Sequence, residues 1–209
     1  MLVKQMLLIG GIVLVSSRTT IGEEDANSLQ LDTSSELRVE GTSNVHAYTI
    51  LAEHLSIQTK TEPVDIERLS EPEAAFYQRF HHGRLQQLAL TIPVAEMSSS
   101  RAGLDRRFYQ ALKSKDYPEI RFLLTDYQIT GEGVSRDAFV IDCSGELTVA
   151  GKTQPISLKI GAEFSDKGLV ITGNKELLMS QFDIRPPTAM MGLMKTGDRV
   201  TIRFALILK

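Results

Sequence analysis

The feature that most constrains the fold of this chain is a strict alternation of apolar and polar side chains through its last third. Successive side chains of a β-strand point to opposite faces of a sheet, so this alternation predicts strands with one buried face. Short polar turns separate the alternating segments, which predicts antiparallel neighbours joined by hairpins. In the clearest segment the positions on the buried face are Phe139, Ile141, Cys143, Gly145, Leu147 and Val149.

Alternating segments also precede this region, and together they predict eight or nine strands from residue 29 onward. Residues 104–112 have helical spacing instead, and this helix ends before Pro118, because proline disfavours the helical conformation in the residue before it. A sheet of about eight long strands with one apolar face closes most economically on itself. We therefore predict an all-β fold, an extended antiparallel β-barrel with one short helix. A two-sheet β-sandwich is the alternative.

The first 17 residues differ from the rest of the chain. Lys4 is their only charge, residues 6–15 are apolar or glycine, and Ser16 and Ser17 are small, which is the layout of a secretory signal peptide. The apolar run is about half of the roughly 20 residues that a membrane-spanning helix needs, although an uncleaved anchor is the alternative. We predict a signal peptide over 1–17, a flexible segment over 18–28 and a barrel domain over 29–209.

The balance of charge excludes one class of function. Removing Lys4 with the signal peptide takes away one of 23 basic side chains and none of the 26 acidic ones, so the exported chain is mildly acidic. A nucleic-acid-binding protein needs a basic stripe that neutralises phosphates. We therefore predict no nucleic-acid partner.

Residues suited to catalysis or metal binding are scattered. His46 and His54 lie roughly 26 Å apart on a straight strand, and the adjacent His81 and His82 point to opposite sides of an extended chain. Cys143, the only cysteine, falls on the buried face, where an inert thiol is expected. The chain has no CxxC, HExxH, GxSxG, P-loop or GxGxxG motif. We predict no metal site, no catalytic residue and no resident cofactor, and so a protein that is not an enzyme.

The predicted inner face is poor in bulky side chains. The chain has no tryptophan, and Gly41, Ser43, Gly145 and Ala162 recur at inward positions. Close-packed interiors tolerate little empty volume. An eight-stranded barrel has room for its own side chains or for one small ligand. The interior is thus either flattened around its own side chains or filled by a ligand.

Residues 182–194 cannot form an ordinary strand, since Pro186 and Pro187 remove backbone donors. The segment is rich in methionine, whose flexible and polarisable side chain suits a surface that adapts to an apolar partner. We expect the segment either to plug one end of the barrel as core or to form a lid over an apolar cavity.

Four segments carry further information when they are taken in order. They are VEGTSNVHAYT (39–49), LDRRFYQALKSKDYPEIRF (104–122), GELTVAGKTQPISL (145–158) and SQFDIRPPTAMMGLMKTGDRVTIRF (180–204). Together they resemble the YceI-like family of polyisoprenoid-binding proteins over roughly residues 29–208. The resemblance implies a lipocalin-like barrel that binds, stores or transports an isoprenoid-type or other long-chain lipid without catalysis. It also implies a periplasmic or secreted location in the bacterial cell envelope.

We predict that such a lipid, for example a polyisoprenoid or a prenyl quinone, contacts apolar side chains on the inward strand faces and at the cavity mouth. A transient contact with a membrane surface is also expected. Asn44, His46 and Arg185 are the nearest candidates to meet a polar head group. The predicted ligand-binding residues are Val39, Val45, Leu90, Ile92, Phe122, Phe139, Ile141, Leu147, Leu158, Phe182, Met190, Met191, Met194 and Phe204.

Two other functions stay open. A solid barrel could serve as an envelope-stress or partner-binding module, with the methionine-rich segment as an exposed contact patch. An enzyme that acts on a lipid would need polar side chains converging inside the cavity, and the sequence pattern shows none.

Overall fold

The structure is a computed structural model and describes residues 29–61, 85–132, 138–189, 191 and 193–209. The predicted signal peptide, the segment 18–28 and the residues His81, His82 and Met190 lie outside the described residues. The predicted division of the chain into three parts therefore stays a prediction.

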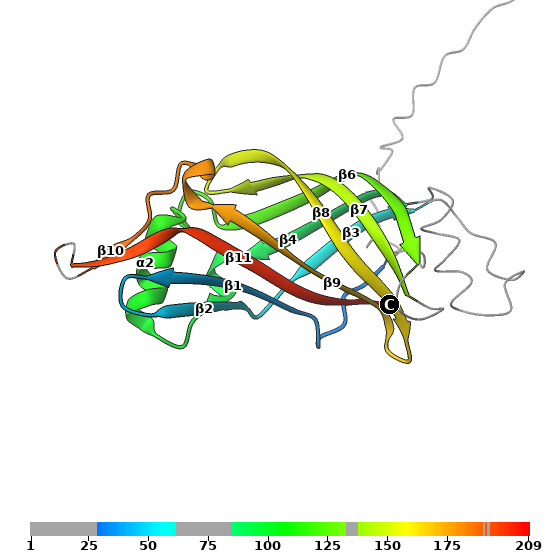
Figure 1. The fold of residues 1–209 in the computed structure, drawn as a ribbon, viewed down its shortest axis with the longest axis horizontal. Coiled ribbons are helices and arrows are strands. Elements are labelled where there is room, and N and C mark those ends of the chain that lie inside the picture. The colour runs from blue at the N-terminus through cyan, green and yellow to red at the C-terminus, as the bar shows by residue number, and fades with distance from the viewer. Residues whose placement is uncertain (1–28, 62–84, 133–137, 190, 192) are drawn as a thin grey trace, which may run out of the picture.

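The described strands form one antiparallel sheet that curls around an elongated interior (Figure 1). Their order across the sheet is β3-β4-β6-β7-β8-β9-β11-β1-β2-β5, and β10 pairs with β11. The strands are β1 (Glu36–Ser43), β2 (Ala47–Ala52), β3 (Ser56–Thr61), β4 (Leu85–Pro93), β5 (Met97–Ser98), β6 (Glu119–Glu132), β7 (Ala138–Val149), β8 (Lys152–Ser165), β9 (Gly168–Leu178), β10 (Thr188–Ala189) and β11 (Met194–Leu208).

The curled sheet is a half-barrel that the chain itself closes at one end. Strand β4 continues through the short 3-10 helix η2 (Val94–Glu96) into β5, and β5 pairs with β2 through Leu51↔Ser98 and Ala52↔Met97. The prediction of an all-β, antiparallel, barrel-like fold with one short helix is confirmed. The sheet has more strands than expected because β5 and β10 are only two residues long, too short for periodicity to detect.

The hairpin of β7 and β8 shows how local sequence sets the register. Ala150 and Gly151 both have positive φ, 49° and 79°, as the two central residues of a type I′ turn require. From this turn the two strands pair without interruption from Val149↔Lys152 to Ala138↔Glu163. The predicted inward positions of β7 are buried in strict alternation.

The predicted inward position of Val45 is wrong, because Val45 lies in the turn between β1 and β2. Val45 was expected on the inner face with Val39 and Gly41, but it is 62% exposed. The hydroxyl of Ser43 accepts hydrogen bonds from the backbone N–H groups of Val45 (3.2 Å) and His46 (3.1 Å). This turn reverses the chain after Ser43, so Val45 lies at its tip and no longer belongs to the strand alternation.

Helix α2 (Ala102–Ala111) covers the end of the half-barrel that lies opposite the C-terminus (Figure 1). It agrees with the helix predicted over 104–112. The Tyr109 hydroxyl donates to the carbonyl oxygen of Met97 at 2.7 Å, and Asp105 accepts from the backbone N–H of Ser99 at 2.8 Å. These bonds fix the helix to β5 and to the segment that follows it.

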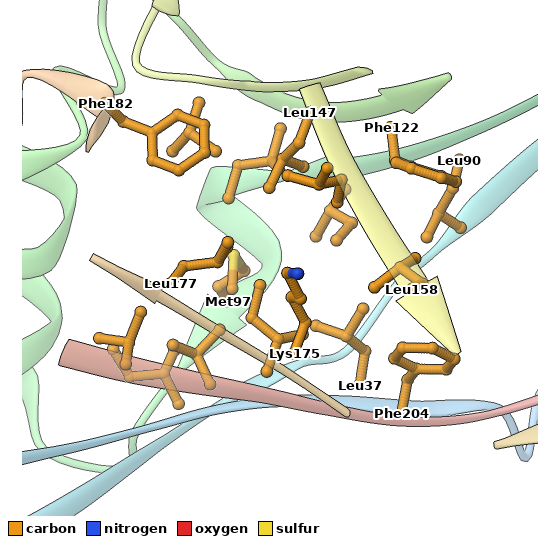
Figure 2. Close-up of a pocket in the computed structure, with 18 of the residues that line it drawn as sticks. Leu37, Leu90, Met97, Phe122, Leu147, Leu158, Lys175, Leu177, Phe182 and Phe204 are labelled. Atoms are coloured by element: carbon orange, nitrogen blue, oxygen red, sulfur yellow. The ribbon is translucent and has the colours of Figure 1, made fainter. Parts of the chain in front are cut away.

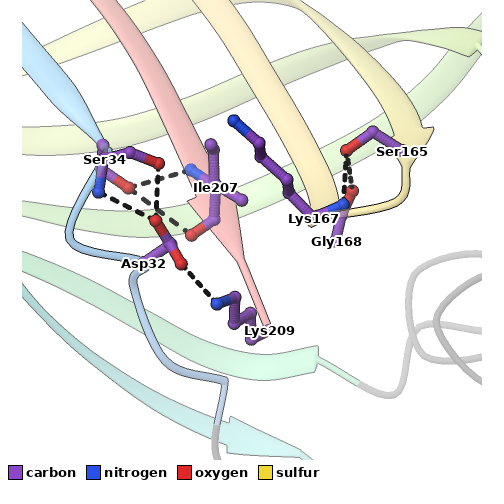
Figure 3. A network of polar contacts seen from close by, with 8 residues as sticks. Asp32, Ser34, Ser165, Lys167, Gly168, Ile207 and Lys209 are labelled. Carbon is purple, nitrogen blue, oxygen red and sulfur yellow. Dashed lines mark hydrogen bonds and ion pairs between the residues drawn. The ribbon is translucent and has the colours of Figure 1, made fainter.

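At the other end, the first described residues run beside the end of β11. The backbones of Gln30 and Lys209 exchange hydrogen bonds of 3.0 and 2.9 Å, and the Asp32 N–H donates to the carbonyl oxygen of Ile207 at 2.8 Å. Asp32 also forms an ion pair with Lys209 and accepts from the Ser34 N–H at 2.8 Å (Figure 3). This polar network joins the first described segment to the last strand.

Candidate functional site: an apolar cavity inside the half-barrel

The fully buried apolar side chains fall into three clusters, and partly buried side chains such as Phe122 and Phe204 connect them. One contains Ile141 and Ile160, a second contains Leu147 and Leu177, and the third contains Ile50 and Met97. A domain of this size usually has one contiguous core. Members of all three clusters border the same cavity, whose volume is about 230 Å³. The interior is therefore hollow where the three clusters would otherwise meet.

The lining of the cavity is almost wholly hydrocarbon. Inward positions of the strands, one face of α2 and the 3-10 helix η3 (Met179–Phe182) all contribute to it (Figure 2). Among the described residues, Lys175 is the only charged residue in the lining. The other polar or sulfur-containing lining residues are Tyr48, Met97, Tyr127, Cys143, Met179 and Thr196.

The inward glycines are covered by aromatic rings from other strands. A side-chain carbon at Gly145 would lie 2.5 Å from Cζ of Phe122 and 2.6 Å from the carbonyl oxygen of Leu123. A carbon at Gly173 would lie 2.5 Å from Cζ of Phe204. The ring of Tyr48 covers Gly41 in the same way. Rings packed over glycines are a recurrent device of β-sheets. Here they occupy the space that the small inward residues leave, and the cavity exists in addition to that space.

Most of the predicted ligand-binding residues share this cavity. The side chains that line it are Val39, Leu90, Ile92, Phe122, Ile141, Leu147, Leu158, Phe182 and Phe204. The position of Phe122 depended on strand register, and the structure places it on the inner face, over Gly145. That these residues contact a ligand stays a prediction.

Two further predicted residues lie elsewhere. Phe139 is buried but packs against Phe164, with ring centroids 5.9 Å apart, and does not line the cavity. Met191 is fully exposed, at 105%. The hairpin of β10 with β11 carries the chain outward, so Met191 lies in the loop between the two strands. Met190 and the side chain of Met194 lie outside the described residues.

The part of residues 182–194 that does border the cavity is its first half. Phe182 and Ile184 are buried, and Pro187 lines the cavity with them. Asp183, between them, adopts a left-handed conformation with φ of 56°. This turn after η3 allows both neighbouring apolar side chains to enter the interior.

Sequence reasoning missed two sets of lining residues. The apolar face of α2 was recognised as helical, but Leu104 and Phe108 of the helix and Leu112, which caps it, were not assigned to the cavity. Lys175 was not singled out, although it has the same alternation phase as Ile171 and Leu177, which are buried. That phase is the signal that would have found it.

The three head-group candidates do not line the cavity. The Asn44 amide donates to the carbonyl oxygen of Leu193 at 2.8 Å and accepts from the Lys195 N–H at 2.8 Å, which ties the β1–β2 turn to the start of β11. Nε2 of His46 lies 3.0 Å from Nη1 of Arg101. Arg185 is exposed.

Reactive groups are scarce in and around the cavity. Burial raises the pKa of the Cys143 thiol to about 11, and the nearby carboxylates of Asp142 and Asp126 add to the effect. A thiol in this state is a poor nucleophile. In the described part of the chain, no group of three or more His, Cys, Asp or Glu side chains is placed to hold a metal ion. None of the described helices is long and apolar enough to cross a membrane.

One antiparallel sheet curled around an apolar cavity defines a lipocalin-like barrel. The chain belongs to the YceI-like family, because the family model described as YceI-like domain matches residues 48–208. A search of curated proteins returned no significant match.

Solved structures share the fold. BcnA of Burkholderia cenocepacia is 16% identical with a TM-score of 0.59, covering 84% of this chain and 98% of BcnA. A polyisoprenoid binding domain from Saccharophagus degradans, implicated in plant cell wall breakdown, is 12% identical with a TM-score of 0.60, covering 87% and 97%. The YCEI protein of Campylobacter jejuni is 18% identical with a TM-score of 0.51, covering 96% and 99%. At these identities the likeness establishes the fold.

Proposed function

We propose that this protein binds a long-chain lipid, of isoprenoid or similar hydrocarbon type, inside the half-barrel and carries out no chemistry on it. The observation that carries the proposal is the cavity of about 230 Å³, bordered by all three apolar clusters and lined by one charged residue among those described. Membership of the YceI-like family and the polyisoprenoid binding domain among its structural neighbours support the same ligand class.

The size of the cavity sets how much of a tail it holds without rearrangement. A cavity of roughly 150 Å³ accommodates a benzene ring, so the present volume corresponds to roughly nine carbons, or about two isoprene units. Burial contributes about 0.8 kcal/mol per CH₂ group, or roughly 4 kcal/mol per five-carbon isoprene unit. Association costs an estimated 4–15 kcal/mol, so about four or five units are needed for useful affinity. We expect the longer tail to displace lining side chains or to extend out of the cavity.

Native mass spectrometry of the protein purified from a bacterial host tests the proposal. We expect a co-purified lipid, or uptake of an added prenyl quinone. Ile202→Trp fills the lumen from β11 and should lower uptake, whereas Val45→Trp, at an exposed turn, should not. A protein that stays lipid-free and also refuses the added quinone would rule the proposal out.

We also propose that the protein works outside the cytoplasm, in the cell envelope. The support is the charged, apolar and small-residue order of residues 1–17 together with membership of the YceI-like family. Fractionation of cells that express the chain with and without residues 1–17 tests this. We expect export, with a shortened chain, only when these residues are present, and equal cytoplasmic retention of both forms would contradict it.

We propose, third, a transient contact with a membrane surface. Val45 and Leu193 are 62% and 73% exposed, and the Asn44 hydrogen bonds hold their loops together at the α2 end of the half-barrel. The exposed basic residues Lys195 and Arg101 lie beside them and complement anionic lipid head groups. We expect binding to anionic vesicles that falls when Val45 and Leu193 are both changed to Ser, measured by co-sedimentation. Unchanged binding would contradict this contact.

A further inference from the structure

Strands β8 and β9 are hydrogen-bonded only near the turn that joins them. Their pairing runs from Ser165↔Gly168 to Ile160↔Gly173 and stops there. Beyond that point β8 remains paired with β7 down to Lys152, and β9 remains paired with β11 up to Leu178. The two strands diverge from their turn toward the α2 end (Figure 1). The backbone ladder therefore has a gap, called here the β8–β9 gap, which is bounded by residues 152–159 of β8 and 174–178 of β9.

The sequence of β8 is typical of a sheet edge in the part of the strand that does not pair with β9. Pro155 lies in the unpaired part of the strand, opposite Glu146 of β7. Proline has no backbone donor, and within sheets it is confined to edges, strand starts and bulges. A second neighbour on the β9 side would find no N–H group at this position, so Pro155 opposes closure of the gap.

The cavity reaches this gap. Ile156 and Leu158 of β8 line the cavity and are only half-buried, and Leu177 of β9 lines it from the other side. Side chains of the described residues bridge the gap, and Lys152 of β8 also pairs with Asp183, beyond the end of β9, at 3.2 Å. The Gln154 amide donates to the carbonyl oxygen of Gln181, and the Lys175 ammonium donates to that of Ser157, both at 2.8 Å. Side chains instead of a backbone ladder thus span this part of the wall.

Lys175 lies where the gap opens onto the apolar interior (Figure 2). Within the described part of the chain no acidic side chain forms an ion pair with it, and its one hydrogen bond is to the Ser157 carbonyl oxygen. An ammonium group has three donors, so two remain for another acceptor. Lys175 is only half-buried and its hydrogen bond with Ser157 lies at an exposed position, so its apolar stem lines the interior while the ammonium stays accessible at the gap.

We propose that the β8–β9 gap receives the head group of the bound lipid and that Lys175 recognises an anionic head group, either carboxylate or phosphate. This inference rests on the proposed lipid-binding function. The ammonium would form a charge-assisted hydrogen bond with the head group, while the tail extends into the cavity past Leu158 and Leu177. The negative charge of the head group supplies an ionic partner for the Lys175 ammonium. The tail shields the remaining apolar lining from water.

A comparison of three lipids with the same tail tests the charge. Geranylgeraniol, geranylgeranoic acid and geranylgeranyl phosphate differ only in the head group. We expect the protein to bind at least one acidic lipid about tenfold or more tightly than the alcohol, as one charge-assisted hydrogen bond predicts. Lys175→Met should abolish this preference, measured as the ratio of the affinity for the acidic lipid to the affinity for the alcohol. Lys175→Arg should restore most of it. Whichever acidic lipid shows the larger Lys175-dependent preference identifies the head-group chemistry.

The matched control is Lys159→Met. Lys159 lies on β8, at the other edge of the gap, but it is exposed, pairs with Asp142 at 3.3 Å and does not line the cavity. The Lys159→Met variant should keep the preference for the acidic lipid. Because the readout is a ratio of affinities within one variant, a general folding defect would weaken all three lipids together. Equal affinity of the wild-type protein for all three lipids, or a preference that survives Lys175→Met, overturns the head-group assignment but not lipid binding. Failure to bind any of the three overturns both.

A second measurement tests the gap independently of charge. In a Cys143→Ala background, Lys175→Cys places a single thiol at the gap, and its rate of reaction with a maleimide reports access. Bound geranylgeraniol should slow this reaction severalfold, because a head group in the gap covers the thiol. A rate that saturating lipid does not change would show that the head group lies elsewhere and overturn its placement in the β8–β9 gap.

Discussion

At the scale of single residues, glycines paired with aromatic rings shape the wall of the cavity. Phe204 packs over Gly173, and Phe122 packs over Gly145. Both glycines follow the alternation of β9 and β7, although only Gly145 was assigned to the inner face from the sequence. The sequence does not show which ring occupies the space above each of them, since that depends on the register between strands that are far apart in the chain.

Gly173→Ala should therefore disturb the ring of Phe204. The added carbon would lie 2.5 Å from Cζ of Phe204 and 3.0 Å from Cγ2 of Ile160, so side chains alone must move. We expect the free energy of unfolding, measured in urea, to fall by about 1–3 kcal/mol. Phe204→Leu in the same chain should recover part of the loss, and a purely additive double mutant would contradict the packing. Gly103→Ala is the control, because nothing lies within 4 Å of its added carbon and alanine favours the helix.

The buried thiol gives a pH-dependent prediction. Burial raises the pKa of Cys143 from its ordinary 9.0 to about 11, so above pH 9 the unfolded chain releases a proton that the folded chain retains. Stability should therefore fall between about pH 9 and pH 11. The measurement is the difference in free energy of unfolding between the wild-type protein and Cys143→Ala across this range. The comparison removes the contribution of Tyr48, Tyr109 and Tyr127, whose pKa values are also raised by burial. A difference that does not change with pH would contradict the prediction.

At the scale of elements, the strands were predictable wherever alternation is uninterrupted, as in β7 and β8. The inward position of a residue was not predictable where a turn or a short hairpin interrupts the strand. Ser43 reverses the chain before Val45 can return to the inner face, and the β10–β11 hairpin carries Met191 out of the barrel. These outcomes depend on hydrogen bonds and on pairings that a periodic pattern does not contain.

The polar network that joins the first described segment to β11 through Asp32 should weaken in acid. The hydrogen bonds from Lys209 and Ser34 lower the pKa of the Asp32 carboxyl well below its ordinary value. A lowered pKa in the folded state stabilises the protein above the ordinary pKa, near 4, and this contribution is lost progressively as the pH falls below it. Asp32→Asn should thus lower stability at pH 7, and its difference from the wild type should shrink below about pH 4, as measured by thermal unfolding. Asp142→Asn, which breaks an exposed pair, should have little effect at any pH.

At the scale of the whole molecule, the division of the core into three clusters has a thermodynamic consequence. Side chains that border a cavity lack packing partners on one side, so a ligand that fills it stabilises the folded state. We expect a prenyl quinone at about 100 times its Kd to stabilise the protein by about 2.7 kcal/mol and to raise its Tm. Ile202→Trp should lose most of this shift, and Val45→Trp should keep it. An equal shift in both variants would place the ligand outside the cavity.

The sequence by itself determined that the chain forms antiparallel strands with one apolar face, one short helix, and an interior made of hydrocarbon. Those properties follow from side-chain periodicity and from turn residues, which act over a few positions. Only the tertiary structure decided where the three clusters separate, which rings cover which glycines, and that β8 and β9 part to leave Lys175 at a gap. Each of these depends on how strands distant in the chain pair and diverge, because volume and openings belong to the assembled sheet and not to any one segment.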